Sequence, residues 1–390
     1  MPPRRILTVA LQILISIYLF VSIAFGIKLT YVHYRLPMDF GSFIASGLLA
    51  RSNDDPYSYE HPLVFKVPIT DYKLIIPSPN LNPPISIIPF DVLARYSPDP
   101  ILAGMIWRSF SLLVYAIFAA WVVVTYSGVH KWILAIWLFA LAGFWQTIEV
   151  GQIYIPLLIS TYLAWRALAG GNTIRAGVLM GALIAVKPQF GLWALSMLLI
   201  GEYAAFLSTS ITVVVISLLP LFLFEPRVYG QWIAAIGKYD GILLPGNMSI
   251  LGPLSHIGFK TTGLLLSGLV CIVLLLFIWR NKPPALQTSY LAILLTNFIS
   301  PYSWSGYTLF LLPELLNTMK PSGKFIAGTM LLAFPLPFVL EYYTNSALHS
   351  VTIGWVYGWA ILLLLWDCLE TTRRLRNEVM VKNDTPTALS

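Results

Sequence analysis

The stretch Met38-Asp39-Phe40-Gly41-Ser42-Phe43-Ile44-Ala45-Ser46-Gly47-Leu48 decides how the rest of the chain is interpreted. It follows the first long apolar segment and belongs to a polar segment, residues 31–99, in a chain that is otherwise mostly apolar. A carboxylate beside a membrane helix is costly unless it is paired or faces water, so Asp39 is a candidate functional group. The alternative is that Asp39 only caps the short helix after it.

Two short helices are expected in this polar segment. A helix over residues 40–50 places on one face the residues Phe40, Phe43, Ile44, Gly47 and Leu48. Such spacing is typical of an amphipathic helix lying flat at a membrane surface, where it would hold Asp39 over the mouth of a bundle. A second interfacial helix is expected from Pro83 to about Tyr96.

Composition identifies a polytopic membrane protein. Of the 390 residues, 57% are hydrophobic and 11% are charged, and the mean hydropathy is +0.76. Soluble domains carry about 25% charged residues, and no water-soluble core needs this much apolar surface. The net charge of +7 comes from basic residues near the ends of apolar segments. That placement suits cytoplasmic loops and lipid head groups and gives no sign of nucleic-acid binding.

The apolar segments predict an all-α membrane domain over residues 1–390 with about twelve transmembrane helices. They run roughly over 6–30, 100–126, 132–148, 153–169, 174–187, 189–201, 203–224, 262–280, 285–299, 306–319, 325–343 and 351–369. Several are shorter than the ~20 residues that a straight span needs. Short helices interrupted by proline usually border a water-filled cavity. The first segment is expected to be a retained helix rather than a signal peptide.

The basic residues of the short loops predict the orientation. If the segment from Pro83 to about Tyr96 is an interfacial helix and not a span, all of these basic residues lie in the cytoplasm. Both chain termini then lie in the cytoplasm as well. Residues 31–99 and 225–260 then form the first and second extracytoplasmic loops, and residues 370–390 form a cytoplasmic tail.

Four polar clusters fall on the same predicted side as Asp39. They are Glu149-Val150-Gly151-Gln152, Val186-Lys187-Pro188-Gln189, Gly246-Asn247-Met248-Ser249 and Ile299-Ser300-Pro301-Tyr302-Ser303-Trp304. Their gathering at one end of the bundle is the strongest physical indication of a site.

The charged and amide residues among these features each have two interpretations. Glu149 is costly in lipid and has to pair or face water. Gln152 suits a donor to a sugar, although Gly151 beside it also suits a plain turn. Lys187 attracts a phosphate as a point charge, or its chain reaches toward the interface. Arg108, inside a predicted span, either reaches the outer interface or pairs with a phosphate or carboxylate.

The other two clusters combine hydroxyls, an amide and aromatic rings. Asn247 and Ser249 either bind a ligand or cap a helix. Ser300 and Trp304 belong to a run whose rings and hydroxyls are the combination that sugar binding uses. The alternative for this run is an aromatic belt at the membrane interface.

The first polar segment holds weaker candidates. Asp54-Asp55-Pro56-Tyr57 is most simply a turn, and a divalent cation at Asp54 and Asp55 is the minor alternative. The two cysteines, Cys271 and Cys368, lie inside apolar segments, so no disulfide framework or metal cluster is expected. No cofactor is expected. Asn82 precedes two prolines and is expected to be structural, with a ligand contact as the alternative.

No nucleotide-binding, zinc-protease or serine-hydrolase motif is present in the sequence. An enzyme that works outside the membrane without a nucleotide needs an activated substrate delivered through the lipid. A polyprenyl-phosphate sugar meets that requirement.

The order of these features resembles glycosyltransferase family 87, within the C-type superfamily of multi-spanning enzymes. The matching pieces, over about residues 30–310, are Asp39-Phe40 with Asp55-Pro56-Tyr57, Asn82-Pro83-Pro84-Ile85, Gly151-Gln152, Ala176-Gly177 with Gly181 and Lys187-Pro188, Asn247-Met248-Ser249, and Ser300-Pro301-Tyr302-Ser303-Trp304. The resemblance implies the C-type architecture, a polyprenyl-phosphate mannose donor, and inverting transfer to a lipid-linked or cell-envelope glycan. It also implies the bacterial inner (plasma) membrane, with the active site extracytoplasmic.

The resemblance gives Asp39 the essential role, as base, and gives Lys187 and Arg108 the donor phosphate. The expected sugar or acceptor contacts are Gln152, Glu149, Asn247, Ser249, Ser300, Trp304, Tyr57 and Asn82. Mannosyl members often carry histidines where this chain has Ser305-Gly306-Tyr307. Asp39 would then act without them.

Three other functions fit the same composition. A transporter or flippase of lipid-linked glycans predicts polar sites at mid-membrane and internal repeats, and no repeat is evident. A non-catalytic relative that binds lipid glycans would explain the missing histidines. A polymerase or ligase of surface polysaccharide is the third.

Overall fold

The structure is a computed structural model, and it is almost entirely helical. It describes residues 3–31, 38–51, 54–57, 63–66, 73–76, 80–97, 99–125, 131–239, 246–318 and 321–384. The prediction of an all-α polytopic membrane protein is confirmed. The exception is a hairpin in the first polar segment, where β1 (Leu63–Lys66) pairs antiparallel with β2 (Lys73–Ile76), in the register Leu63 with Ile76.

Long apolar helices form much of the outside of the bundle. They are α1 (Pro3–Tyr31), α4 (Pro100–Thr125), α10 (Tyr203–Leu218), α13 (Lys260–Asn281) and α19 (Val356–Asp384). Each turns large apolar side chains outward; Ile211 on α10 is 63% exposed and Leu265 on α13 is 72% exposed. Apolar surface of this extent on a helix is what lipid covers.

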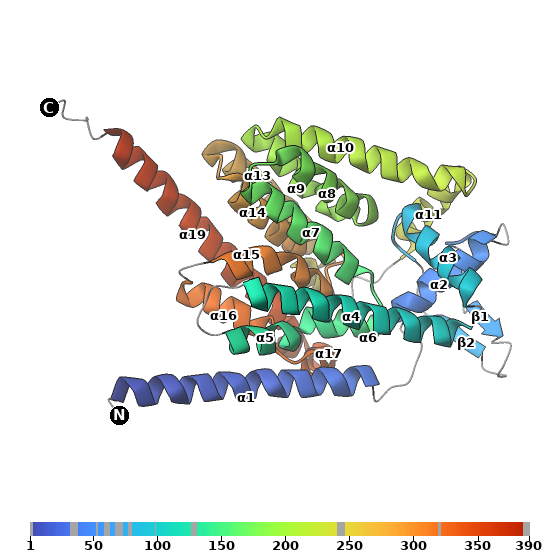
Figure 1. Cartoon of the computed structure of the whole chain (residues 1–390), viewed down its shortest axis with the longest axis horizontal. Coiled ribbons are helices and arrows are strands. Elements are labelled where there is room, and N and C mark those ends of the chain that lie inside the picture. The colour runs from blue at the N-terminus through green and yellow to red at the C-terminus, as the bar shows by residue number, and fades with distance from the viewer. Residues whose placement is uncertain are drawn as a thin grey trace.

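Shorter helices fill the space between the long ones. They are α5 (Lys131–Ala140), α6 (Ala142–Val150), α7 (Tyr154–Ala169), α8 (Thr173–Val186), α9 (Gly191–Ile200), α14 (Ala285–Ile299), α15 (Leu312–Asn317), α16 (Gly323–Leu331), α17 (Leu336–Asn345) and α18 (Ala347–Val351). α14 is the central helix, because every residue from Thr288 to Phe298 is buried. It packs against α7, α9, α13 and α19, and it lies among them in Figure 1.

The count of about twelve spans is not confirmed. In the described part of the chain, five helices are long and apolar enough to cross a membrane, or seven if each of two bent pairs is one span. The bends are 41° between α5 and α6, and 79° between α16 and α17. The predicted span 306–319 is instead a buried 3-10 helix, η5 (Ser305–Leu311), followed by the six residues of α15.

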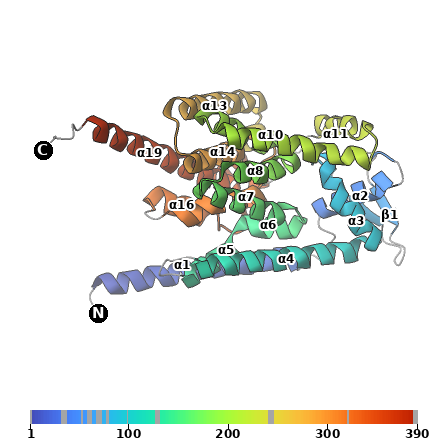
Figure 2. The same ribbon diagram turned by 45° about the horizontal axis from the view of Figure 1, so that its top comes forward.

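The polar elements gather at one end of the long axis. Here lie α2 (Met38–Arg51), η1 (Pro84–Ser86), α3 (Ile87–Tyr96) and α11 (Arg227–Lys238), at the right of Figure 1 and Figure 2. The N- and C-terminal ends of the chain lie at the opposite end (Figure 1).

Both predicted short helices of the first polar segment are present, as α2 and α3. α2 is not buried on one side only, since Ser42 and Ser46 are as buried as Phe43. Phe43 stacks on Phe90 of α3, with ring centroids 4.7 Å apart. The close packing depends on Gly47, because a Cβ there would lie 2.7 Å from the backbone nitrogen of Asp91. Protein therefore surrounds α2 and fixes the start of the helix, where Asp39 stands.

Candidate functional site

Asp39 and Gln152 meet at the polar end of the bundle. Asp39 lies in the first turn of α2 and is partly exposed, whereas Gln152 is buried. The Gln152 side-chain amide donates from Nε2 to Oδ2 of Asp39 over 2.5 Å. The carboxylate thus bonds a residue far away in the chain, which favours a site over a simple helix cap.

The end of α6 explains how Gln152 reaches this position. Gly151 adopts a left-handed conformation with φ of 74°, which glycine tolerates and most residues do not. The Gln152 backbone N–H then bonds the carbonyl of Thr147 at 3.0 Å, closing the helix end. The carbonyl of Gly151 accepts a hydrogen bond from the indole of Trp107 on α4 at 3.0 Å. The turn is therefore held on both sides.

Lys187 follows α8 and is 5% exposed. Its ammonium lies 4.7 Å from the ring centroid of Tyr154 and 5.4 Å from that of Tyr307. The two aromatic faces favour the charged form of the Lys187 amine, whereas burial opposes it and lowers the pKa of Lys187 to about 7. Within the described part of the chain, this ammonium has no carboxylate within 4.0 Å. The charge of Lys187 acts on Asp39 at longer range. Because no carboxylate pairs with the ammonium directly in the described chain, an anionic ligand could bind there.

Tyr307 is itself fixed in place. Gln189, in the short η2 helix (Pro188–Phe190), donates from Nε2 to the Tyr307 hydroxyl at 2.9 Å. The Tyr154 and Tyr307 ring centroids lie 4.8 Å apart. Gly306 allows this contact, because a Cβ there would lie 2.5 Å from the Tyr154 ring. The contacts of Tyr154 and Tyr307 with Lys187 were not predicted from the sequence. The position of Tyr154, two residues after Gln152, was the available signal.

Burial and neighbouring groups oppose each other at Asp39. Burial raises the pKa of its carboxyl above the ordinary value, while the hydrogen bond from Gln152 and the charge of Lys187 lower it. The net direction is upward, which is the direction that makes a carboxylate a better proton acceptor near neutral pH.

Glu149 and Arg108 stand near the same centre. The charge of Glu149 interacts with those of Asp39 and Arg108, which brings all three into one electrostatic group. The Nε atom of Arg108 is buried and has no hydrogen-bond partner among the described residues. The sequence predicts Glu149 as a sugar or acceptor contact and Arg108 as a contact to the donor phosphate.

Asn247 and Ser249 join two loops. The Asn247 amide donates to the carbonyl of Pro301 at 2.7 Å, and its Oδ1 accepts from the Ser249 hydroxyl at 2.9 Å. Asn247 also forms an antiparallel bridge with Trp304. Asn247 and Ser249 are 0% exposed, Ser300 is 7% exposed, and Trp304 is partly exposed. Of these predicted contacts, Trp304 has the most accessible side chain.

Two hydrogen bonds connect this loop pair to the centre. The Tyr302 hydroxyl donates to the carbonyl of Tyr239 at 2.7 Å, and Tyr239 lies within electrostatic reach of Asp39. Gln146 on α6 accepts through Oε1 from the backbone N–H of Gly306 at 2.7 Å. The loop of residues 300–306 is thus fastened to the helix that carries Glu149.

Tyr57 and Asn82 lie together, in a separate small core. The Tyr57 hydroxyl donates to the carbonyl of Asn82 at 2.9 Å, and Asp55 accepts from the backbone N–H of Tyr57 at 2.9 Å. These bonds agree with the expected turn. Among the described residues, no group of three or more His, Cys, Asp or Glu could hold a metal ion. No hydrogen bond in the part of the chain that the structure describes joins Tyr57 or Asn82 to Asp39.

The fold and the site define a polytopic membrane protein with a charged, aromatic-lined centre at one end of its bundle. Residues 80–301, more than half of the chain, match the model of glycosyltransferase family 87, and the chain belongs to that family. It is therefore a membrane glycosyltransferase, which needs a sugar donor and an acceptor, and the predicted resemblance is confirmed. Searches of curated proteins and of solved structures gave no match. Asp39 precedes the matched range, so the match itself does not bear on the role of Asp39. The support for that role is the geometry around its carboxylate.

Proposed function

We propose that this protein transfers a hexosyl unit, with mannose the expected sugar, from a polyprenyl-phosphate sugar to a lipid-linked or cell-envelope glycan. The reaction would take place on the extracytoplasmic side of the bacterial inner membrane. One observation carries the proposal: a partly exposed carboxylate, Asp39, is held by Gln152 beside a buried cation, Lys187, that has no ion-pair partner in the described chain.

Asp39 would act as the general base in a single displacement. The Gln152 amide holds Oδ2, which leaves Oδ1 for the acceptor hydroxyl. As the hydroxyl oxygen attacks the anomeric carbon, its proton passes to Asp39. The bond from the anomeric carbon to the phosphate oxygen breaks, and the electron pair leaves with the polyprenyl phosphate. Attack from the opposite face inverts the anomeric centre.

Lys187 would stabilise the leaving phosphate. The Tyr154 and Tyr307 faces keep the ammonium in place without neutralising its charge. A cation that is positioned in advance and partly shielded from water stabilises developing negative charge more than a solvated one does. Arg108 would provide a second positive charge, with its buried Nε available for a hydrogen bond.

The proposal is tested with the purified protein in lipid nanodiscs, a polyprenyl-phosphate mannose donor and a glycolipid acceptor. Product analysis by NMR should show a new glycosidic bond with the anomeric configuration opposite to that of the donor. Retention of configuration would contradict the single displacement. Transfer only from a different donor class would contradict the polyprenyl-phosphate assignment, and absence of transfer from every donor would favour a non-catalytic relative.

A further inference from the structure

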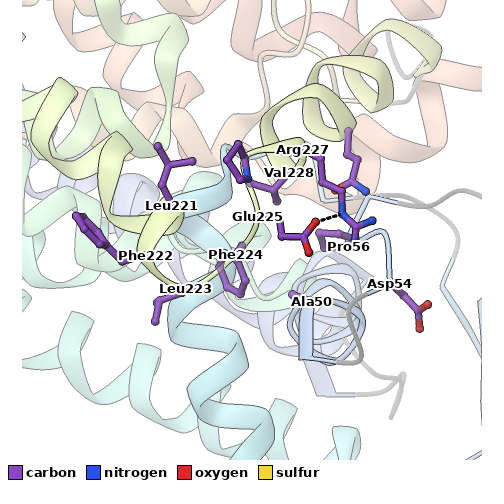
Figure 3. Close-up of a pocket in the computed structure, with 12 residues that line it drawn as sticks. Ala50, Asp54, Pro56, Leu221, Phe222, Leu223, Phe224, Glu225, Arg227 and Val228 are labelled. Atoms are coloured by element: carbon purple, nitrogen blue, oxygen red, sulfur yellow. Dashed lines mark ion pairs between the residues drawn. The ribbon is translucent and has the colours of Figure 1, made fainter.

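A hollow of about 380 Å³ lies at the polar end of the molecule, and Figure 3 shows the residues that line it. One wall is the C-terminal end of α2 with the turn after it, including Ala50, Asp54 and Pro56. The other wall is the corner that leads from η3 (Leu219–Phe222) into α11. None of the residues placed at the Asp39 centre lines this hollow.

One side of the hollow is apolar and continues a membrane helix. Phe222 is 83% exposed and Leu223 is 60% exposed. The candidate span that includes α10 ends at Phe222, and the outward face of α10 carries Ile211 and other exposed apolar residues. A lipid chain that lies along α10 would therefore lead directly to the edge of the hollow.

The other side of the hollow is polar, and the described residues that line it carry no excess of positive charge. Glu225 pairs with Arg227 through Oε2 and Nε at 3.0 Å, as the dashed line in Figure 3 shows. Asp54 and Gln231 complete the polar lining. Two carboxylates against one guanidinium disfavour a phosphate. Guanidinium and amide donors beside carboxylate acceptors suit hydroxyl groups, which both donate and accept hydrogen bonds.

Contacts with the rest of the protein hold the wall of the hollow in place without a ligand. Val228 is buried in a small core with Tyr57 and Ile87, and Phe224 packs against that core. The indole of Trp232 on α11 donates to the carbonyl of Leu81 at 3.0 Å. A site that needs little ordering loses little binding free energy when a ligand enters.

α2 connects the hollow to the Asp39 centre. Asp39 and Ala50 lie on this one helix, and a helix rises by ~1.5 Å per residue, so about 16 Å separates them along the helix axis. A glycan of several sugar rings can cover that distance.

We propose that the hollow binds the sugar nearest the lipid in a glycolipid acceptor with a neutral headgroup. Its lipid chain lies along α10, and its growing end reaches Asp39 along α2. The inference rests on the proposed function, whose acceptor class it narrows.

The binding test uses Gln231→Cys in nanodiscs and the rate at which a water-soluble maleimide labels that cysteine. Dodecyl maltoside and dodecylphosphocholine serve as probes, because they share one tail and differ in the headgroup. The maltoside should slow labelling by at least about threefold, a free-energy difference of at least about 0.65 kcal/mol, and the phosphocholine should not slow it. Adding Phe222→Ala should remove the protection.

Gly237→Cys provides the matched control, because Gly237 is exposed on α11 and a Cβ there meets no atom within 4 Å. Its labelling should not change with either probe. Unmodified protein measures any labelling of the two native cysteines. Equal protection of Gln231→Cys by both probes would show that only their shared alkyl tail contacts the hollow. Stronger protection by the phosphocholine would indicate a phospholipid headgroup. Either result, or no protection, overturns the proposal.

A kinetic arm separates this inference from the proposed function. With a neutral glycolipid acceptor, Gln231→Ala should raise the acceptor KM at least about fivefold and leave kcat within about twofold. An unchanged acceptor KM in Gln231→Ala overturns the inference even if wild-type transfer is robust. If wild-type protein transfers no sugar, the proposed function fails, and the labelling result still decides whether the hollow binds a neutral sugar headgroup.

Discussion

The Gln152 amide donates to the Asp39 carboxylate over 2.5 Å, although 113 residues separate the two in the chain. This contact joins the start of α2 to the end of α6. It occupies one carboxylate oxygen, Oδ2, and the proposed mechanism uses the other, Oδ1, to accept the proton. In the proposed mechanism Gln152 is therefore a positioning residue, and Asp39 is the group that takes the proton.

Gln152→Leu removes this hydrogen bond and should change the pH dependence of transfer. The bond lowers the pKa of Asp39 against the effect of burial, so its loss raises that pKa further. Because the base acts when it is deprotonated, the rate falls as the pH drops through the pKa. The acid limb of the pH–rate profile should therefore move to higher pH, with kcat at its plateau reduced about tenfold. Gln152→Glu should move the limb upward as well, since a second carboxylate disfavours ionisation of the first.

A pH–rate profile of the two variants beside wild type provides the measurement. An unchanged acid limb in both variants would show that the titrating group is not Asp39, or that Gln152 does not act on it.

Lys187→Met should reduce kcat/KM for the polyprenyl-phosphate donor by about 10²–10³, since it removes a preorganised cation from the leaving phosphate. Lys187→Arg should restore part of the loss, because it keeps the charge but not the fit over the two rings. Steady-state kinetics with varied donor gives the values. Lys238→Met, at an exposed position at the end of α11, controls for the loss of one positive charge. Equal activity in the Lys187 and Lys238 variants would exclude the assigned role.

Two substitutions at Tyr307 separate its ring from its hydroxyl. Tyr307→Phe keeps the aromatic face beside Lys187 and loses the bond from Gln189, so kcat should fall less than about threefold. Tyr307→Leu removes the face, worth about 1 kcal/mol, and should reduce kcat by about fivefold or more. The comparison is made at saturating donor. Because Tyr307→Leu also lacks the hydroxyl, equal losses of kcat in Tyr307→Phe and Tyr307→Leu would mean that the hydroxyl, and not the ring, matters.

Gly47→Ala should destabilise the polar end of the molecule. Its Cβ would lie 2.7 Å from the backbone nitrogen of Asp91, and backbone cannot move aside as a side chain can. Such overpacking costs about 1–3 kcal/mol. Thermal unfolding in nanodiscs should show a lower midpoint than wild type, whereas Gly230→Ala, where a Cβ meets no atom within 4 Å, should show none of this decrease. A wild-type midpoint for Gly47→Ala would contradict the tight packing of α2 against α3 at this position.

The positions of several long helices and the proximity of Asp39, Gln152 and Lys187 followed from the sequence. The long apolar segments of the sequence placed α1, α4 and α13 within a few residues of their observed bounds. Counting membrane crossings put Lys187 and Gln152 on the side of Asp39, and the structure brings these three together.

The number of spans and the packing of α2 did not follow from the sequence. An apolar segment such as residues 306–319 has the same composition whether lipid or protein surrounds it, and here protein surrounds it. The aromatic support of Lys187 was also missed, because it depends on Tyr307 in a distant part of the chain. Tertiary contacts decide such features, and periodicity along one segment does not record them.

The most direct test of the account is the transfer rate of Asp39→Asn, measured in nanodiscs with a polyprenyl-phosphate sugar donor. Asp99→Asn is the matched control, because an asparagine there keeps the oxygen that accepts from the backbone N–H of Ile101. Loss of the general base should lower kcat of Asp39→Asn by about 10²–10⁴, with Asp99→Asn close to wild type. Transfer by Asp39→Asn at the wild-type rate would contradict the assignment of Asp39 as the base.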